Sequence, residues 1–319
     1  MTLTLRRLLL QIALVLAVGG GFVAVFLNAR ANLEARHIPT SFDFLGQTAG
    51  FGLNQSLIPF GPFNSYGRAL LVGLLNTLMV SGLSAIFATL IGFAAGFART
   101  SAHWALSRLA MLYVETFRNI PLLLHMLFWY VAILSPLPAP ADSYEFAGVL
   151  LNNRGLSLPG LSFAGFLPVL DWPHFDPAIN PFNVEGGWRL PPEVTALVVA
   201  LSLYTGTYIA EIVRAGVQAV PRGQSEAAAA LGLDPAQIRR KVVTPQALRI
   251  VMPPLISQYL ALTKNSSLAA FIGFADLMQV SGTILNQTGA ALQTIALDMG
   301  LYLALSAVTL ALMRYYQRQ

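Results

Sequence analysis

The sequence contains no cysteine and few charged residues. Without cysteine there is no disulfide bond, no thiolate metal site and no cysteine nucleophile, although the redox compartment stays open. Charged residues make up 10% of the 319-residue chain and hydrophobic residues 55%, whereas soluble domains carry about 25% charged residues. This difference excludes an ordinary soluble protein and predicts an integral membrane protein with one membrane domain.

The chain also lacks the motifs that common catalytic sites require. No G-x-x-x-x-G-K-[ST] run is present to wrap the phosphates of ATP, and no serine lies in a G-x-S-x-G turn. The histidines are too scattered to form a metal site: His37, His103, His125 and His174. We therefore expect that the chain is not an enzyme and binds neither a metal nor a cofactor itself.

About six apolar stretches are long enough to cross a bilayer, whose hydrocarbon core takes about 20 helical residues. They run over 8–27, 69–97, 113–134, 194–213, 253–274 and 295–313. We interpret the first as a retained anchor rather than a cleaved signal peptide, although Ala29-Arg30-Ala31 resembles a cleavage site. In the third stretch, Pro121 is expected to kink or restart the helix.

These stretches divide the chain into four segments. We expect an N-terminal anchor and outer segment over 1–68, the first part of a membrane core over 69–134, an insertion over 135–192 and the second part of the core over 193–319. A short interfacial helix is expected near 42–51. The insertion is too polar to span the bilayer, and its aromatic residues suit an ordered cap at the membrane interface: Trp172, Phe175, Phe182 and Trp188.

The basic residues indicate the orientation of the chain. An N-terminus inside the cell places most arginines and lysines in the cytoplasm and leaves few on the outer side: Arg30, Arg36, Arg68, Arg154 and Arg189. The positive-inside rule therefore predicts that both termini are cytoplasmic and that the insertion lies outside.

One helix of the core carries polar side chains on an otherwise apolar surface: Asn76, Thr77, Ser81 and Ser84. Hydrogen bonds between helices and a route for solute are both open explanations, and we take Asn76 as a candidate pathway residue. Further along the same helix, Gly92 and Gly96 form a small-xxx-small pair, which predicts close packing against another helix.

The most polar cluster within an apolar span comprises Lys264, Asn265, Ser266 and Ser267. A lysine within the membrane is costly and is therefore a functional candidate. Pairing of Lys264 with Glu211 or Asp276, only to hold helices together, is an alternative of at least equal weight.

Between the fourth and fifth spans, a polar and basic segment is predicted to form two short helices joined at a glycine. Ser225 can cap an alanine-rich helix and Gly232 can end it. Asp234 can then cap the next helix behind Pro235, with Gln237 reaching back in a capping box. An alanine-faced helix lets the groove of a partner approach closely. A DNA-binding helix-turn-helix also fits this pattern, but the short tether between membrane spans argues against it.

These residues carry a family resemblance. Glu226-Ala227-Ala228 and Gly232, followed by Pro-Gln-Ala-Leu-Arg and Pro-Pro, resemble the EAA loop of bacterial ABC importer permeases, here residues 222–255. Lys264–Leu268 is similar to the polar amino acid branch of that family. So are the two acid–base pairs at i,i+3 spacing, although Asn119-Ile120 replaces the usual Gly-Thr beside the first: Glu115 with Arg118, and Glu211 with Arg214.

The resemblance implies an all-α integral membrane protein of about six transmembrane helices, with a cytoplasmic coupling-helix loop and a long periplasmic insertion. It implies a permease subunit of an ATP-driven importer for polar amino acids in the bacterial inner membrane. The expected partners are two cytoplasmic ATPase subunits that hold ATP and Mg²⁺, a second and paralogous permease subunit, a periplasmic amino-acid-binding protein and lipid, but no nucleic acid. A secondary transporter or channel without an ATPase is the alternative, which would need no docking helix.

The expected site residues fall into three groups. The ATPase-coupling residues are Glu226, Ala227, Ala228 and Gly232. The candidate pathway residues are Asn76, Tyr208, Glu211, Lys264, Asn265, Ser266 and Ser267. The residues of pairs at the membrane edge are Glu115, Arg118 and Arg214.

Overall fold

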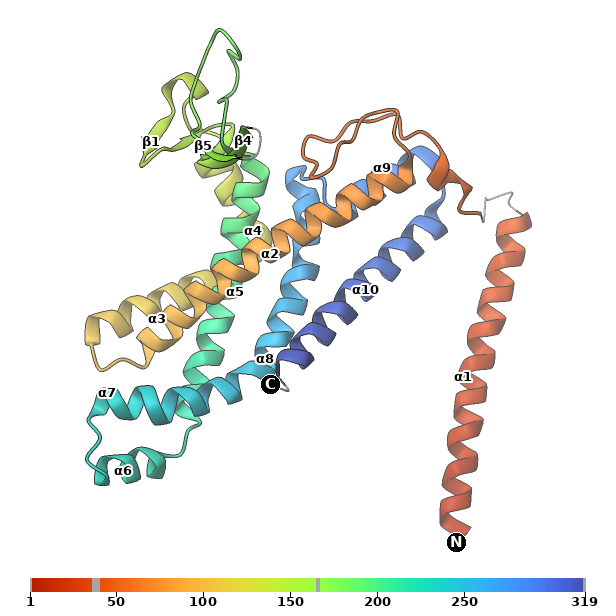
Figure 1. The fold of residues 1–319 in the computed structure, drawn as a ribbon. Helices are drawn as coiled ribbons and strands as arrows, with labels where there is room; N and C mark the ends of the chain where they lie inside the picture. Colours follow the sequence, from red (N-terminus) through yellow and green to blue (C-terminus); the bar gives the residue numbers. More distant parts are fainter. Residues whose placement is uncertain (1, 36–40, 165–166, 318–319) are drawn as a thin grey trace.

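The computed structural model describes residues 2–35, 41–164 and 167–317 (Figure 1). Arg36 and His37, which entered the sequence arguments, lie outside the described residues. The α-helices are α1 (Thr2–Ala35), α2 (Tyr66–Arg99), α3 (Trp104–Asn119), α4 (Leu122–Leu127), α5 (Pro192–Gln218), α6 (Arg222–Ala230), α7 (Pro235–Ile238), α8 (Thr244–Asn265), α9 (Leu277–Thr288) and α10 (Ala291–Gln317). Tighter or wider helical turns are η1 (Asp43–Gly46), η2 (Phe128–Leu134), η3 (Pro140–Asp142), η4 (Arg239–Val243) and η5 (Ser266–Ile272).

The helices of the described chain account for four to six membrane spans. Four of them, α1, α2, α5 and α10, are each long and apolar enough to cross a bilayer. Two bent pairs raise this number to six: α3 with α4 and η2, and the run from α7 to η5 with α9. The result agrees with the predicted membrane architecture, although η1 is shorter than the interfacial helix expected over 42–51.

Figure 1 shows how the elements are distributed between the two ends of the molecule. The start of α1, the end of α10 and the pair α6–α7 lie toward one end, and the β-strands and α9 lie toward the other. The helix α1 stands apart from the rest in Figure 1, and its apolar stretch, Leu10–Leu33, is not buried inside the protein. We call the end that carries α6 the coupling end.

The helices α2 and α5 pack closely against each other in the core, and glycine makes this contact possible. A Cβ atom at Gly92 would lie 2.5 Å from Cβ of Ile209, and one at Gly96 would lie 2.6 Å from Cβ of Val213. No real Cβ tolerates such distances, so only glycine lets the two backbones approach this closely. The predicted small-xxx-small contact is confirmed.

The third span is bent far more sharply than a kinked helix. The axes of α3 and of α4 with η2 differ by 103°. Ile120 has an extended backbone (φ −94°, ψ 130°), as expected for a residue before proline, and α4 starts after Pro121. His125 fixes the bend, because its Nε2 donates to the carbonyl oxygen of Phe117 over 2.9 Å and its ring stacks on Phe117. The predicted restart at Pro121 is confirmed, but α3 begins earlier than expected, at Trp104.

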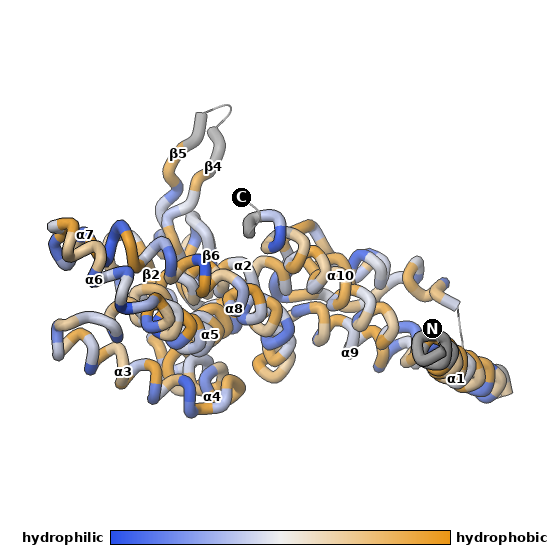
Figure 2. Tube along the Cα trace, turned by 90° about the horizontal axis from the view of Figure 1, so that it is seen from below, coloured by the Kyte–Doolittle hydropathy of each residue, from blue (hydrophilic) through white to orange (hydrophobic). Residues whose placement is uncertain are grey.

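The insertion is folded, as predicted, but it contains β-strands that the sequence analysis did not predict. An antiparallel sheet has the order β1-β2-β3-β6, and β4 pairs with β5 in a hairpin that projects from the helices in Figure 2. Leu151 and Leu190 pack on the core cluster that includes Leu197 and Leu201 of α5. The sheet therefore rests on the membrane helices and is an addition to the helical fold. Its strands are β1 (Tyr144–Phe146), β2 (Val149–Asn152), β3 (Gly155–Leu158), β4 (Gly160–Ala164), β5 (Leu167–Asp171) and β6 (Trp188–Leu190).

The helix α9 was missed in the sequence, and the span before it starts earlier than predicted. α8 begins at Thr244 rather than at Pro253, and the chain turns through η5 before α9. Asp276 caps α9 by accepting the backbone N–H of Gln279 at 2.8 Å. The hydroxyl of Thr77 accepts the N–H of Leu277 at 3.1 Å, which ties this turn to α2.

Candidate functional site

The helix α6, which carries the candidate coupling residues, starts earlier than predicted. Pro221 precedes it with an extended backbone (φ −59°, ψ 133°), and the first helical residue is Arg222. Ser225 therefore lies inside the helix and is not its N-cap, which corrects the sequence-based expectation. The chain enters α6 directly after Pro221, so the proline sets the boundary.

The end of α6 is closed by its own backbone. Gly232 has φ +84°, its N–H donates to the carbonyl of Ala229 over 2.9 Å, and the N–H of Leu233 donates to the carbonyl of Ala228 over 3.2 Å. These two hydrogen bonds form the Schellman arrangement, which requires a residue that accepts positive φ. The predicted helix end at Gly232 is confirmed.

The outer surface of α6 is small and open. Glu226 and Ala227 are exposed, whereas Ala228 is buried against the protein. Leu231, at the end of the helix, is 83% exposed. Leu231 was not among the predicted coupling residues; its signal in the sequence is a large apolar side chain between a run of alanines and a glycine. The exposed surface of α6 and its C-terminal end thus consists of one carboxylate, a face of small alanine side chains and one leucine.

The second half of the segment is fixed to the core. Asp234 and Gln237 form the predicted capping box at the start of α7. Beyond α7, the guanidinium of Arg239 donates to the carbonyl of Phe97 over 2.9 Å and to the hydroxyl of Thr100 over 3.1 Å. The α6–α7 segment is therefore attached to the C-terminal end of α2.

An ionic cluster joins α2 and α5 near the same end. Glu211 pairs with Arg99 of α2 and with Arg214 of its own helix, and Arg214 also donates to Gln218. The predicted pair of Glu211 and Arg214 is present. Glu211, a candidate pathway residue and one of two possible partners of Lys264, forms its ion pairs with these two arginines.

The other predicted acid–base pair, Glu115 with Arg118, does not form in the described chain. Arg118 lies over the ring of Tyr208, with its Cζ 5.1 Å from the ring centroid, and no ion pair joins it to Glu115 in the described chain. The ring quadrupole of Tyr208 attracts the guanidinium, which turns it away from Glu115. The hydroxyls of Tyr204 and Tyr208 lie 3.0 Å apart, so Tyr208 belongs to a polar aromatic cluster beside the bend.

Asn76 is fully buried and holds three segments together. Its side-chain amide donates to the backbone oxygens of Gln55 and Ala275 over 2.9 and 2.8 Å. This arrangement favours the packing explanation for Asn76 over a direct contact with solute.

The polar cluster at the end of α8 uses its hydroxyl groups locally. Ser266 donates to the carbonyl of Thr263 and Ser267 to that of Lys264, each over 2.8 Å. Lys264 is exposed and forms no ion pair with Asp276, whose carboxylate caps α9. Because it is exposed, Lys264 stays a candidate pathway residue.

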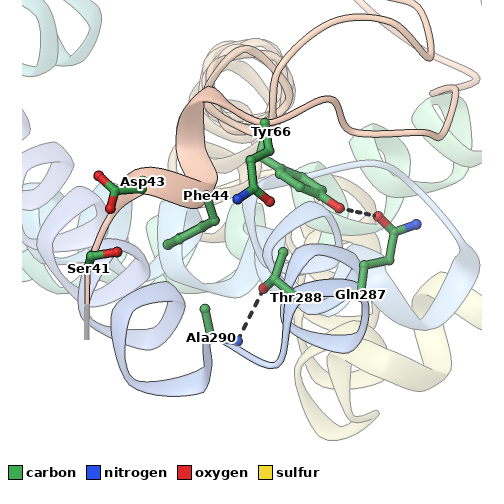
Figure 3. Close-up of a pocket in the computed structure, with 8 residues that line it drawn as sticks. Ser41, Asp43, Phe44, Tyr66, Gln287, Thr288 and Ala290 are labelled. Atoms are coloured by element: carbon green, nitrogen blue, oxygen red, sulfur yellow. Dashed lines mark hydrogen bonds between the residues drawn. The ribbon is translucent and has the colours of Figure 1, made fainter. Parts of the chain in front are cut away.

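A cavity of about 420 Å³ opens at the end of the molecule opposite α6 (Figure 3). In its wall the hydroxyl of Tyr66 donates to Oε1 of Gln287 over 2.9 Å. The candidate pathway residues do not line this cavity, which the sequence analysis did not predict. Its lining consists of Ser41, Asp43, Phe44, Gln47, Tyr66, Gln287, Thr288 and Ala290.

Comparison with known proteins places these features in a context. The family model described as "Binding-protein-dependent transport system inner membrane component" matches residues 88–319. The chain is 42% identical to the general L-amino acid transport system permease protein AapQ of Rhizobium johnstonii, over 98% of this chain and 91% of that protein. It is 37% identical to the glutamate/glutamine/aspartate/asparagine transport system permease protein BztB of Rhodobacter capsulatus, over 98% and 93%.

Solved structures support the fold. A crystal structure of an amino acid ABC transporter with histidines is 24% identical, covers 79% of this chain and 94% of the matched chain, and superimposes with a TM-score of 0.57. An inward-facing MetNI methionine ABC transporter is 20% identical and covers 79% and 96%, with a TM-score of 0.53. At these identities the similarity concerns the arrangement of the helices.

Proposed function

Because the chain belongs to the family of binding-protein-dependent transport system inner membrane components, we propose that it forms the membrane pathway of an ATP-driven importer for polar amino acids. The names of its relatives support amino acids as the cargo. The observation that carries the proposal is the exposed, self-capped helix α6, since a transporter driven without ATP needs no such docking element.

We further propose the partners and the orientation. Two cytoplasmic ATPase subunits, which hold ATP and Mg²⁺, dock on α6, and this chain itself catalyses no reaction. A paralogous permease completes the pathway, and a periplasmic binding protein delivers the amino acid. The positive-inside rule assigns the coupling end to the cytoplasm, and with it both termini. The β-strands then face the periplasm, because they lie at the other end of the molecule (Figure 1).

In this mechanism α6 acts as a lever. Closure of the ATPase dimer moves the docked helix, and the membrane helices shift between outward-open and inward-open states, each stabilised by its own ligands. Glu226 and the alanine face contact the ATPase, and Gly232 fixes the exit from α6. Lys264 and Tyr208 remain candidates for contact with the amino acid, because both carry polar groups on partly open surfaces.

The test is transport by the purified complex. The chain is isolated gently from its membrane, co-purifying subunits are identified by mass spectrometry, and the complex is reconstituted into vesicles with its binding protein. We expect ATP-dependent and binding-protein-dependent uptake of polar amino acids. A preparation that preserves such complexes but yields no ATPase, or uptake that proceeds without ATP, would contradict the proposal.

A charge reversal tests the coupling helix itself. Glu226→Lys should uncouple ATP hydrolysis from uptake, since it places a cation where the docked surface meets an anion. Glu145→Lys is the matched control, because Glu145 is also exposed but lies on β1 at the opposite end of the molecule. Normal coupling in Glu226→Lys would remove Glu226 from the docking surface.

A further inference from the structure

Arg239 is the first residue of η4, directly after α7, and its side chain contacts the end of α2. Its Nη2 lies 2.9 Å from the carbonyl oxygen of Phe97 and 3.1 Å from Oγ1 of Thr100. Its Cζ also lies 5.7 Å from the centroid of the Phe97 ring. One guanidinium therefore makes two hydrogen bonds and a cation–π contact with the last turn of α2.

The place of this contact suits a cation. The carbonyl oxygen of Phe97 already accepts the N–H and the hydroxyl of Thr100. The C-terminal end of a helix carries partial negative charge, so Arg239 adds a cation where this charge favours one. A lysine at this position would supply only a point charge, because it lacks the planar fork that reaches two acceptors and stacks on a ring.

The Arg239 contact completes a closed series of links between α5, α6, α7 and α2 at the coupling end. α5 continues through Pro221 into α6, α6 leads through α7 to Arg239, and Arg239 grips α2. Glu211 then returns from α5 to Arg99 at the end of α2. The covalent chain links α6 to the membrane core in both directions, into α5 before it and through α7 and η4 into α8 after it. Arg239 adds a direct, non-covalent route to α2, which otherwise follows α6 through its packing on α5 at Gly92 and Gly96.

We propose that Arg239 is a positioning residue that transmits the movement of the coupling segment to α2. This inference rests on the proposed function, since it needs an ATPase that moves α6. Without the Arg239 contact, α6 still docks and the ATPase still turns over, but α2 is then moved only through its packing on α5, so ATP hydrolysis proceeds with less transport.

The adjacent residue provides a matched control. Arg240 has the same chemistry and is exposed, so Arg240→Ala removes an equal charge from the same turn without touching α2. In vesicles with the full complex and its binding protein, we expect Arg239→Ala to raise the ATP hydrolysed per amino acid transported by about tenfold. A tenfold factor corresponds to one charge-assisted hydrogen bond, and Arg239→Ala loses two together with a cation–π contact, so tenfold is a conservative figure. Arg239→Lys should fall between wild type and Arg239→Ala, and Arg240→Ala should stay within about twofold of wild type.

Each outcome has a distinct meaning. A wild-type ratio in Arg239→Ala, or an equal rise in Arg239→Ala and Arg240→Ala, overturns the inference. If wild-type vesicles show no ATP-driven uptake, the proposed function itself fails. If Arg239→Ala does not fold, Thr100→Val removes one acceptor of Arg239, together with the hydrogen bond from Thr100 to the carbonyl oxygen of Phe97, and keeps the guanidinium. We expect a smaller rise for Thr100→Val, and an unchanged ratio counts against the inference.

A distance measurement adds a readout that stability does not affect. Because the sequence has no cysteine, spin labels attached through Ala230→Cys on α6 and Ala102→Cys beyond α2 are unique. In wild type the distance between the labels should stay nearly constant when ATP closes the ATPase dimer, since the two elements move together. In Arg239→Lys it should change. An equal change in both backgrounds overturns the inference.

Discussion

Single side chains on α6 decide how the coupling end meets its partner. Leu231 is 83% exposed at the end of α6. Together with the exposed alanines before it, this apolar side chain offers a surface that a groove on a partner can cover. Ala228, by contrast, is buried, so only part of the predicted coupling motif faces outward.

The first prediction concerns Leu231. Leu231→Ser should weaken the affinity of the co-purifying ATPase subunits for the permease by about tenfold or more, because a buried leucine contributes about 1.5–3 kcal/mol. Binding is measured in lipid nanodiscs. Leu161→Ser is the control, since Leu161 is also exposed, at 60%, but lies on β4. ATPase affinity equal to wild type in Leu231→Ser would exclude Leu231 from the interface.

The second prediction concerns the glycine that ends α6. At Gly232 a Cβ meets no atom within 4 Å, so Gly232→Ala tests backbone conformation alone. The left-handed conformation should cost alanine about 1–2 kcal/mol and loosen the end of α6, which lowers coupled uptake. Gly223→Ala in the same helix also meets no atom but has ordinary helical φ, so it should retain uptake. Equal uptake by both variants would show that the Schellman end is dispensable.

At the scale of whole elements, the contact between α2 and α5 carries the fold. Gly92 and Gly96 accept Ile209 and Val213 at distances that exclude any Cβ. The neighbouring Arg99–Glu211 pair closes the same interface at the coupling end. Helices joined this closely move as a unit, which is what a lever acting on them requires.

The third prediction tests this interface. Gly92→Ala should destabilise the protein by about 1–3 kcal/mol, the usual cost of overpacking, because its Cβ would overlap Ile209. Thermal unfolding in detergent measures the effect. Gly82→Ala lies in the same helix with open space around it and should not lower the unfolding temperature. A Gly92→Ala protein as stable as Gly82→Ala would mean that the helices separate at no cost.

Structural features that depend on a few adjacent residues could be predicted from the sequence. Features that depend on contacts between residues far apart in the sequence could not. Gly92 with Gly96, the restart at Pro121 and the capping box at Asp234 are each written in a few adjacent residues. The strands of the insertion are three to five residues long, too short for a clear alternation. The hydrogen bond from Arg239 to Phe97 joins residues 142 positions apart, and no local pattern indicates which of three consecutive basic residues forms it.

Distant contacts also explain why only one of the two predicted acid–base pairs forms. Spacing placed Glu115 with Arg118 and Glu211 with Arg214 equally, but only the second pair forms. The difference lies in the surroundings, because Tyr208 offers its ring to Arg118 while Arg99 reinforces Glu211. The sequence shows which groups can interact, and the packing of α3 and α2 against α5 selects among them.

On the scale of the whole molecule, the two ends differ in composition and structure. The coupling end consists of α6, α7 and the ends of long helices, and the opposite end carries the β-strands and α9 (Figure 1). The long helices between them are predominantly apolar (Figure 2). This difference between the two ends suits a protein that meets different partners on the two faces of a membrane.

The fourth prediction tests this orientation. The absence of cysteine makes single variants specific reporters, so Ala230→Cys on α6 and Leu161→Cys on β4 can each be labelled alone. A maleimide that does not cross membranes should label Leu161→Cys in intact spheroplasts and Ala230→Cys only in inside-out vesicles. The reverse pattern would invert the proposed topology and remove α6 from the reach of a cytoplasmic ATPase.

The way α6 is closed at both ends has a consequence for how such a protein can change over time. Pro221 starts the helix, the Schellman hydrogen bonds end it, and the capping box begins the next turn within two residues. The conformation of this short segment is therefore encoded within itself. Substitutions on its outward face can change which ATPase subunit binds, without disturbing the membrane helices that bind and move the solute. Recognition of the energy source and selection of the solute are then separately evolvable traits of one chain, and the segment is a natural unit for exchange between transporters.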